Sequence, residues 1–183
     1  AIDGLIELNP ELKVSAYPIA DGGEGTAVIF SDYLGLELKT METTNAFGKR
    51  INIEYGTDGK TAVIDIASVV GFGANKGEKL DPSIATTFGI GKVLKKIISN
   101  GHKKVYVGLG GSITNDLGLG MISALGVKFY NKNGEEIVPV GKTFADIYNI
   151  DMNDFYENII VIDDKYGGAS NEIMKAVRHT ALA

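Results

Sequence analysis

The stretch that most constrains the fold of this chain is residues 105–125, VYVGLGGSITNDLGLGMISAL. It begins with the apolar run 105–107, whose β-branched and aromatic side chains are typical of a strand covered on both faces. Glycines at 108, 110 and 111 then allow the backbone to turn sharply. The alternating small and bulky residues that follow predict a helix. The stretch therefore predicts a strand, a tight loop and a helix.

The loop of this unit, residues 110–116, has two interpretations that its residues leave open. Ser112, Thr114 and Asn115 offer side-chain donors, and free N–H groups at a helix start bind phosphate or carboxylate because the helix dipole acts in the same direction. Asp116 would repel such an anion unless it caps the helix, binds magnesium or accepts a proton. The alternative is a well-capped helix entry without a ligand. The number of donors slightly favours an anion site.

A second glycine-rich loop, residues 21–25, lies between a predicted strand at 12–19 and a predicted helix at 27–35. It holds Asp21, Glu24 and three glycines, which is more than a turn needs. The structural alternative is a turn with both carboxylates in solvent or with Glu24 beside the helix start. Magnesium–phosphate sites are often built from two loops at one sheet edge, so we favour a functional role and expect the two loops to face a shared cleft.

The remaining elements follow from periodicity and turn signals. Strands are expected at 37–41, 51–55, 61–66, 127–130, 136–138 and 159–162, with hairpin turns at 57–60 and 131–134. Helices are expected at 1–8, from the Asp81-Pro82 cap onward to Gly101, at 144–148 and within 163–183. His102 directly follows a predicted helix end, where a histidine more often contacts the last carbonyls than catalyses.

Several function classes are excluded by the sequence. The chain has no cysteine, which removes thiolate catalysis and disulfides, and its net charge of -5 disfavours a nucleic-acid partner. Two Gly-Lys-Thr triplets resemble the end of a P-loop, but Glu54 and Glu136 stand where its first glycine must be. Lys60 and Lys142 are therefore interpreted as solvated turn residues. The apolar runs are too short to span a bilayer, so a cytoplasmic protein is expected.

Taken together, PIADGGEGT at 18–26 and GLGGSITNDLGLGMISALG at 108–126 resemble the bacterial glycerate kinase family, which is unrelated to P-loop kinases. DGKTAVIDIASVVGF at 58–72 and TTFGIGKVL at 86–94 support the resemblance, which runs to about residue 162. The resemblance implies an α/β fold, a largely parallel sheet flanked by helices with a mixed or antiparallel portion, in a two-domain architecture. It also implies ATP- and Mg²⁺-dependent phosphorylation of D-glycerate to 2-phosphoglycerate, or to 3-phosphoglycerate.

The same resemblance implies the site residues. They are Asp21 and Asp116 as proton acceptors or magnesium ligands, and Gly22, Gly23, Glu24, Gly25, Gly110, Gly111, Ser112, Thr114 and Asn115 as substrate- or phosphate-binding residues. The N–H groups of residues 110–112 would hold an anionic group, and Asn115 would orient it. The alternatives are a non-catalytic anion-binding module, or a kinase of another small hydroxy acid. Nucleotide and glycerate are the expected partners, and homo-oligomerisation is left open.

The chain departs from the family pattern at both ends. The family's first strand and its Asp-, Ser- and Lys-containing loop would precede Ala1, and its later segments should follow residue 162. We therefore expect a piece of a longer protein, with 1–35 in a Rossmann-like domain, 36–162 in a second α/β domain and 163–183 unassigned. Such a piece is expected to hold an incomplete active site.

Overall fold

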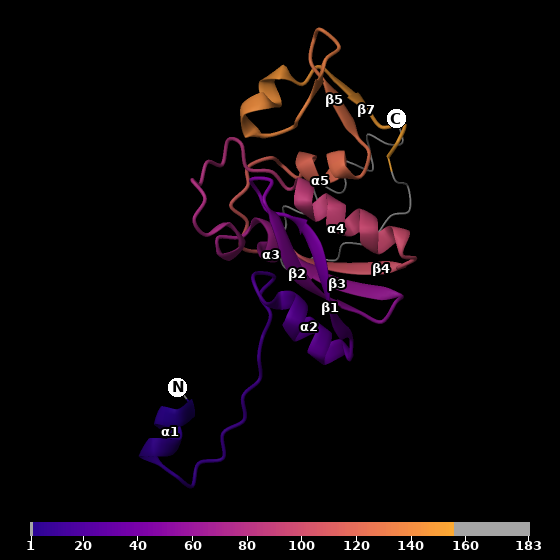
Figure 1. Cartoon of the computed structure of the whole chain (residues 1–183). Helices are drawn as coiled ribbons and strands as arrows, with labels where there is room; N and C mark the ends of the chain where they lie inside the picture. The colour runs from indigo at the N-terminus through magenta and orange to yellow at the C-terminus, as the bar shows by residue number, and fades with distance from the viewer. Residues whose placement is uncertain (1, 156–183) are drawn as a thin grey trace.

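The structure, a computed structural model, describes residues 2–155 and has a mixed α/β fold (Figure 1). Sheet A contains β1 (Glu37–Thr44), β2 (Arg50–Thr57), β3 (Thr61–Asp65) and β4 (Lys104–Gly108), in that order. The β1–β2 and β2–β3 pairs are antiparallel, and β3–β4 is parallel with Asp65 opposite Gly108. The predicted α/β class is confirmed, and the antiparallel portion of the sheet is larger than expected.

Helices cover both faces of sheet A (Figure 1). On one face, α2 (Thr26–Leu34) packs against β2 and β3, and the Phe30 ring lies 6.2 Å from the Tyr106 ring. On the other face, α4 (Phe88–Ser99) buries Ile90, Val93, Leu94 and Ile97 against the sheet. The apolar run at 105–107 predicted a strand covered on both faces, and β4 is covered in this way.

The contacts of α2 join residues 26–34 to sheet A. Ala27 donates its N–H to the Asp65 carboxylate at 3.0 Å, and Ser31 lies directly against Gly56 of β2. Glycine at position 56 leaves room for this close approach. Residues 26–34 therefore belong to the same layered unit as sheet A.

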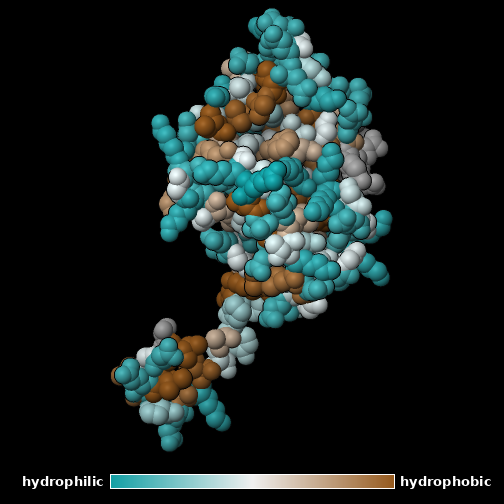
Figure 2. Space-filling model, in the orientation of Figure 1, coloured by the Kyte–Doolittle hydropathy of each residue, from teal (hydrophilic) through white to brown (hydrophobic). Residues whose placement is uncertain are grey.

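The segment before α2 lies apart from the sheet (Figure 1). Helix α1 (Ile2–Leu8) has no buried residue, and its apolar side chains are visible on the surface in Figure 2. The strand expected at 12–19 does not form, because this extended segment pairs with no strand among residues 2–155. The alternating pattern favours extended backbone, but extended backbone becomes a strand only when it pairs with a neighbouring strand.

The region after β4 forms a smaller unit. Helix α5 (Leu119–Ala124) packs on α4, and sheet B has the order β6 (Glu136–Ile137), β5 (Lys128–Tyr130), β7 (Asn149–Asp151), all antiparallel. The hairpin predicted between 127–130 and 136–138 is confirmed. The helix predicted at 144–148 is a 3₁₀ helix at Gly141–Asp146.

Between β3 and α4 the chain forms only short elements, α3 (Ala67–Val70) and η1 (Gly73–Asn75). The long helix expected from Asp81 is a single turn in which Ala85 bonds to the Asp81 carbonyl, and α4 starts later at Phe88. The strand expected at 159–162 and the elements expected in 163–183 lie outside the described residues. Among residues 2–155, no helix has the length and apolarity needed to cross a membrane.

Candidate functional site

Residues 21–25, here called the acidic loop, and residues 110–116, here called the amide corner, touch each other at the carboxyl ends of β3 and β4. The Gly110 N–H donates to the Gly22 carbonyl at 2.8 Å. A Cβ added at Gly111 would lie 4.0 Å from the Gly23 Cα. The two loops thus meet in a direct backbone contact, although they are 85 residues apart or more in the sequence, and the cleft that we expect them to share stays a prediction.

Glycine is required at this contact because backbone meets backbone. A Cβ at Gly108 would lie 2.7 Å from the Gly22 carbonyl oxygen, and a Cβ at Gly110 would lie 2.9 Å from the Gly23 nitrogen. Neither neighbour is a flexible side-chain end that could move aside. Gly108 and Gly110 therefore serve first to leave room for the backbone of the acidic loop.

The Gly110 contact engages one of the three N–H groups expected to bind an anion and leaves the other two available. The Gly110 N–H, expected to bind an anion, is already bonded to Gly22. Within residues 2–155 the N–H groups of Gly111 and Ser112 have no hydrogen-bond acceptor, and both residues are exposed. Two adjacent free donors at an exposed glycine turn are suited to an anionic oxygen.

Side-chain hydroxyls lie beside these two donors. The Ser112 and Thr114 hydroxyl oxygens are 2.7 Å apart, and the Thr114 N–H donates to the Ser112 hydroxyl at 3.1 Å. The Ile113 N–H donates to the Val70 carbonyl at 2.9 Å, which anchors the amide corner on α3. Asn115 is exposed, and among the described residues its side chain has no hydrogen-bond partner. The corner therefore presents two hydroxyls and a free amide to solvent.

The acidic loop presents two exposed carboxylates. Asp21 accepts the Gly23 N–H at 2.9 Å through Oδ1, which shapes the turn. Glu24 reaches over η1, where a Cβ at Gly73 would lie 2.8 Å from its Oε1. Gly22 and Gly25 have φ angles of 89° and 88°, which glycine adopts without strain. Among residues 2–155 neither carboxylate forms an ion pair, so both are free to meet a cation.

Asp116 is in a different environment, because it is 1% exposed and bonded through both carboxylate oxygens. Oδ2 accepts the Thr87 N–H at 2.7 Å and the Thr87 hydroxyl at 2.8 Å, together with the Thr86 hydroxyl and the Gly120 N–H. Oδ1 accepts the Gly118 N–H at 3.2 Å. The carboxylate thus joins the starts of α4 and α5. These contacts match the helix-cap alternative, and a part for Asp116 in the reaction stays a prediction.

Asp65 is a residue of this site that the sequence analysis did not single out. It ends β3, is 3% exposed, and accepts the Ala27 N–H at 3.0 Å and the Ser68 N–H at 2.8 Å. It therefore links α2, directly after the acidic loop, to α3 and to the sheet. The available signal was a carboxylate directly after the apolar run 62–64, at the carboxyl end of a strand.

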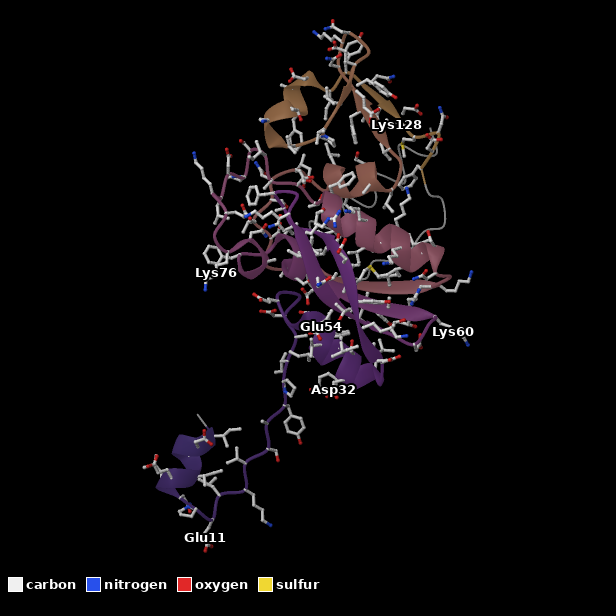
Figure 3. All side chains as sticks on the ribbon, in the orientation of Figure 1. Glu11, Asp32, Glu54, Lys60, Lys76 and Lys128 are labelled. Atoms are coloured by element: carbon white, nitrogen blue, oxygen red, sulfur yellow. The ribbon has the colours of Figure 1, made fainter. Side chains whose placement is uncertain are left out.

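The lysines of the two Gly-Lys-Thr triplets are not part of this site. Lys60 lies on the turn before β3, at the end of the strands away from the two loops (Figure 3). Lys142 is exposed in η2. His102 is also accounted for structurally, because its Nδ1 lies 2.8 Å from the Ile97 carbonyl and its Nε2 lies 2.6 Å from the Thr57 hydroxyl. The contact predicted between His102 and the last carbonyls of the helix is confirmed.

A magnesium ion fits the donor set of the acidic loop. Residues 2–155 contain no cluster of three or more carboxylate or histidine side chains that could hold a metal alone. Mg²⁺ does not require such a cage, because it is usually bound by one or two carboxylates together with water and phosphate oxygens. Asp21 and Glu24 provide two exposed carboxylates of this kind.

Comparisons with known proteins point to one family. A sequence model described as the glycerate kinase family matches residues 1–163. Glycerate 2-kinase from Escherichia coli (strain K12) is 35% identical over 153 residues, covering 82% of this chain and 40% of the relative. A glycerate kinase from Bacillus cereus is 38% identical over 146 residues, covering 79% of this chain and 38% of the relative.

A solved structure has the same fold. The crystal structure of a protein from Salmonella typhimurium LT2 described as glycerate kinase 2 superposes with a TM-score of 0.71 at 30% identity. It covers 85% of this chain and 43% of that protein. The chain thus spans about two fifths of the length of the relatives it matches.

Proposed function

The chain belongs to the glycerate kinase family, and from that premise we propose that its protein transfers a phosphoryl group from ATP to D-glycerate. The observation that carries the proposal is the Gly110–Gly22 hydrogen bond, because it holds free amide donors and free carboxylates side by side. Phosphoryl transfer requires mainly alignment and charge stabilisation from the protein. Those are the two properties that the joined loops supply.

The amide corner is the proposed anion-binding half. The N–H groups of Gly111 and Ser112, with the hydroxyls of Ser112 and Thr114, would bind phosphate or carboxylate oxygens. Asn115 would orient the same group through its free amide. The backbone of the corner is held in place before ligand arrives, since the Ile113 N–H is bonded to the Val70 carbonyl of α3. Donors that do not have to reorganise stabilise developing charge most effectively.

The acidic loop is the proposed cation-binding and proton-accepting half. Asp21 or Glu24 would ligate Mg²⁺, which when bound neutralises charge on the phosphate oxygens. Asp21 would accept the proton of the glycerate hydroxyl, since the residue is exposed and its Oδ2 has no hydrogen-bond partner among the described residues. Asp116 is assigned to holding α4 and α5 together instead. The name of the E. coli relative favours the hydroxyl on carbon 2 as acceptor.

The test is ADP release coupled to D-glycerate on the full-length protein, with Mg²⁺ present and with the product identified by NMR. The expected result is 2-phosphoglycerate, formed only with glycerate, ATP and Mg²⁺ together. Formation of 3-phosphoglycerate would overturn the position of transfer. Phosphorylation of a different hydroxy acid, with glycerate left unchanged, would overturn the substrate.

A binding module without chemistry is the second candidate, and one observation favours it. Asp116, one of the two carboxylates expected to react, is buried and already accepts hydrogen bonds through both of its oxygens. Isothermal calorimetry separates the two functions. Heat from binding of nucleotide or glycerate, combined with no phosphoryl transfer by the full-length protein, would select the module.

A further inference from the structure

The acidic loop is positioned by a carboxylate that lies outside its own sequence. Asp65 is separated from Ala27 by 38 residues, yet its Oδ2 accepts the Ala27 N–H at 3.0 Å. Its Oδ1 accepts the Ser68 N–H at 2.8 Å, and its backbone pairs with Gly108 at the end of β4. The Asp65 side chain therefore fixes the starts of α2 and α3, and its backbone pairs with the strand from which the amide corner begins.

Thr26, which lies between the acidic loop and Ala27, has a buried hydroxyl whose loss of water contacts no hydrogen bond within residues 2–155 offsets. Thr26 is 7% exposed, and its Oγ1 is the buried side-chain oxygen or nitrogen that lacks a hydrogen-bond partner in the described part of the chain. Its methyl group packs towards Gly108, where an added Cβ would lie 3.1 Å from the Thr26 Cγ2. A buried hydroxyl without a partner destabilises a fold, and valine has the same shape without that cost.

We propose that Asp65 and Thr26 form a positioning pair for the reaction of the joined loops. Asp65 holds the acidic loop against the amide corner, and the Thr26 hydroxyl gains its partner when substrate binds, while the loop backbone keeps its place. Neither residue touches substrate, because both are buried beneath the loop. The pair thus acts through the placement of Asp21 and Glu24, and this role rests on the proposed kinase function.

The physical argument for placement is the tightness of the contact. The Gly110 and Gly23 backbones already approach so closely that an added Cβ would clash at 2.9 Å. A loop that shifted by about 1 Å would move its carboxylates out of line with an anion on Gly111 and Ser112, and such misplacement costs on the order of 100-fold in rate. Loss of the Asp65 anchor permits such a shift.

The experiment compares three variants of the full-length protein, Asp65→Asn, Thr26→Val and Ser31→Ala, by kcat, KM and melting temperature. Ser31 is the matched control, because its hydroxyl is buried in the same helix and is satisfied by the Ala27 carbonyl at 2.5 Å. We expect Asp65→Asn to lower kcat at least 10-fold while each KM changes less than 3-fold. Thr26→Val is expected to keep or raise the melting temperature and still lower kcat several-fold.

Ser31→Ala is expected to lower the melting temperature and leave kcat unchanged. The opposite behaviour of two hydroxyls in one helix is a result that a purely structural role does not produce. If Thr26→Val and Asp65→Asn both turn over at the wild-type rate, the pair has no positioning role. If Asp65→Asn fails to fold, the Thr26→Val rate decides alone. Absence of transfer by the wild-type protein would instead defeat the kinase function itself.

Discussion

The acidic loop and the amide corner touch, yet they are stabilised in opposite ways. The amide corner contains its own anchor, since Asp116 is 1% exposed and bonded to the starts of two helices. The acidic loop keeps its carboxylates exposed and depends on Asp65, far away in the sequence. One loop therefore uses its acidic residue for structure, and the other holds its acidic residues available for chemistry.

This difference shows why residue type alone does not assign a role. Asp21 and Asp116 each accompany glycines in a loop before a helix, and both were predicted to take part in the reaction. Burial separates them, because a carboxylate that already accepts several hydrogen bonds in a dry environment has little capacity for a ligand. The same anchoring holds exposed Leu117 in a left-handed conformation, with φ of 52°, which is uncommon outside glycine.

The largest effect is expected from Asp116→Asn, which tests the structural half of the comparison. The amide group keeps the shape but directs N–H atoms at N–H donors such as that of Thr87, so stability should fall by about 3 kcal/mol. Chemical denaturation measures this change, with Asp146→Asn as an exposed control. An unchanged stability together with lost phosphoryl transfer would show that Asp116 takes part in the reaction.

Gly110→Ala tests the contact between the two loops. The added Cβ would lie 2.9 Å from the Gly23 nitrogen and 3.0 Å from the Gly22 carbonyl carbon, so the loops must separate. We expect a loss of about 2 kcal/mol and a loss of transfer activity. Gly4→Ala is the control, because its added Cβ meets nothing within 4 Å. Full activity of Gly110→Ala would show that the loops work independently.

Asp21→Asn and Glu24→Gln test the proposed chemical role of the acidic loop. Both side chains are exposed, so stability should change by less than about 0.5 kcal/mol. Activity of the full-length protein should fall about 100-fold or more for Asp21→Asn if it accepts the proton. Thermal melting and steady-state kinetics on the same samples check both values. A marked loss of stability with normal kinetics would reverse the roles of the two loops.

Asp154→Asn is expected to give the smallest effect on stability. It shows what an exposed carboxylate outside the two loops contributes. Its Oδ2 lies 2.6 Å from the Lys128 Nζ, and this bond holds the pKa of Asp154 below its ordinary value of 3.8. A carboxylate with a lowered pKa stabilises the fold above that value and loses the effect as the pH falls through the folded pKa. The small difference in melting temperature between wild type and variant should therefore shrink as the pH falls below 3.8 and vanish below the lowered pKa of Asp154 in the folded protein.

Much of the fold was predictable because its signals are local. The apolar run at 105–107, the Asp-Gly turn at 57–60 and the hairpin around 131–134 specify their elements within a few residues. The strand expected at 12–19 failed for the converse reason, since a strand also needs a neighbour. The helix expected from Asp81 failed because the Asp116 carboxylate binds the Thr87 N–H and fixes the start of α4 there.

The sequence by itself determined the α/β class, the two glycine-rich loops and the donor types that each loop carries, because turns, periodicity and residue chemistry are properties of neighbouring residues. Only the tertiary structure decided that Asp116 accepts the Thr87 N–H at the start of α4, that Gly110 bonds to Gly22, and that Asp65 anchors the start of α2. These contacts join residues 29 to 88 positions apart. Burial and distant hydrogen bonds arise when the chain packs, and no local pattern records them.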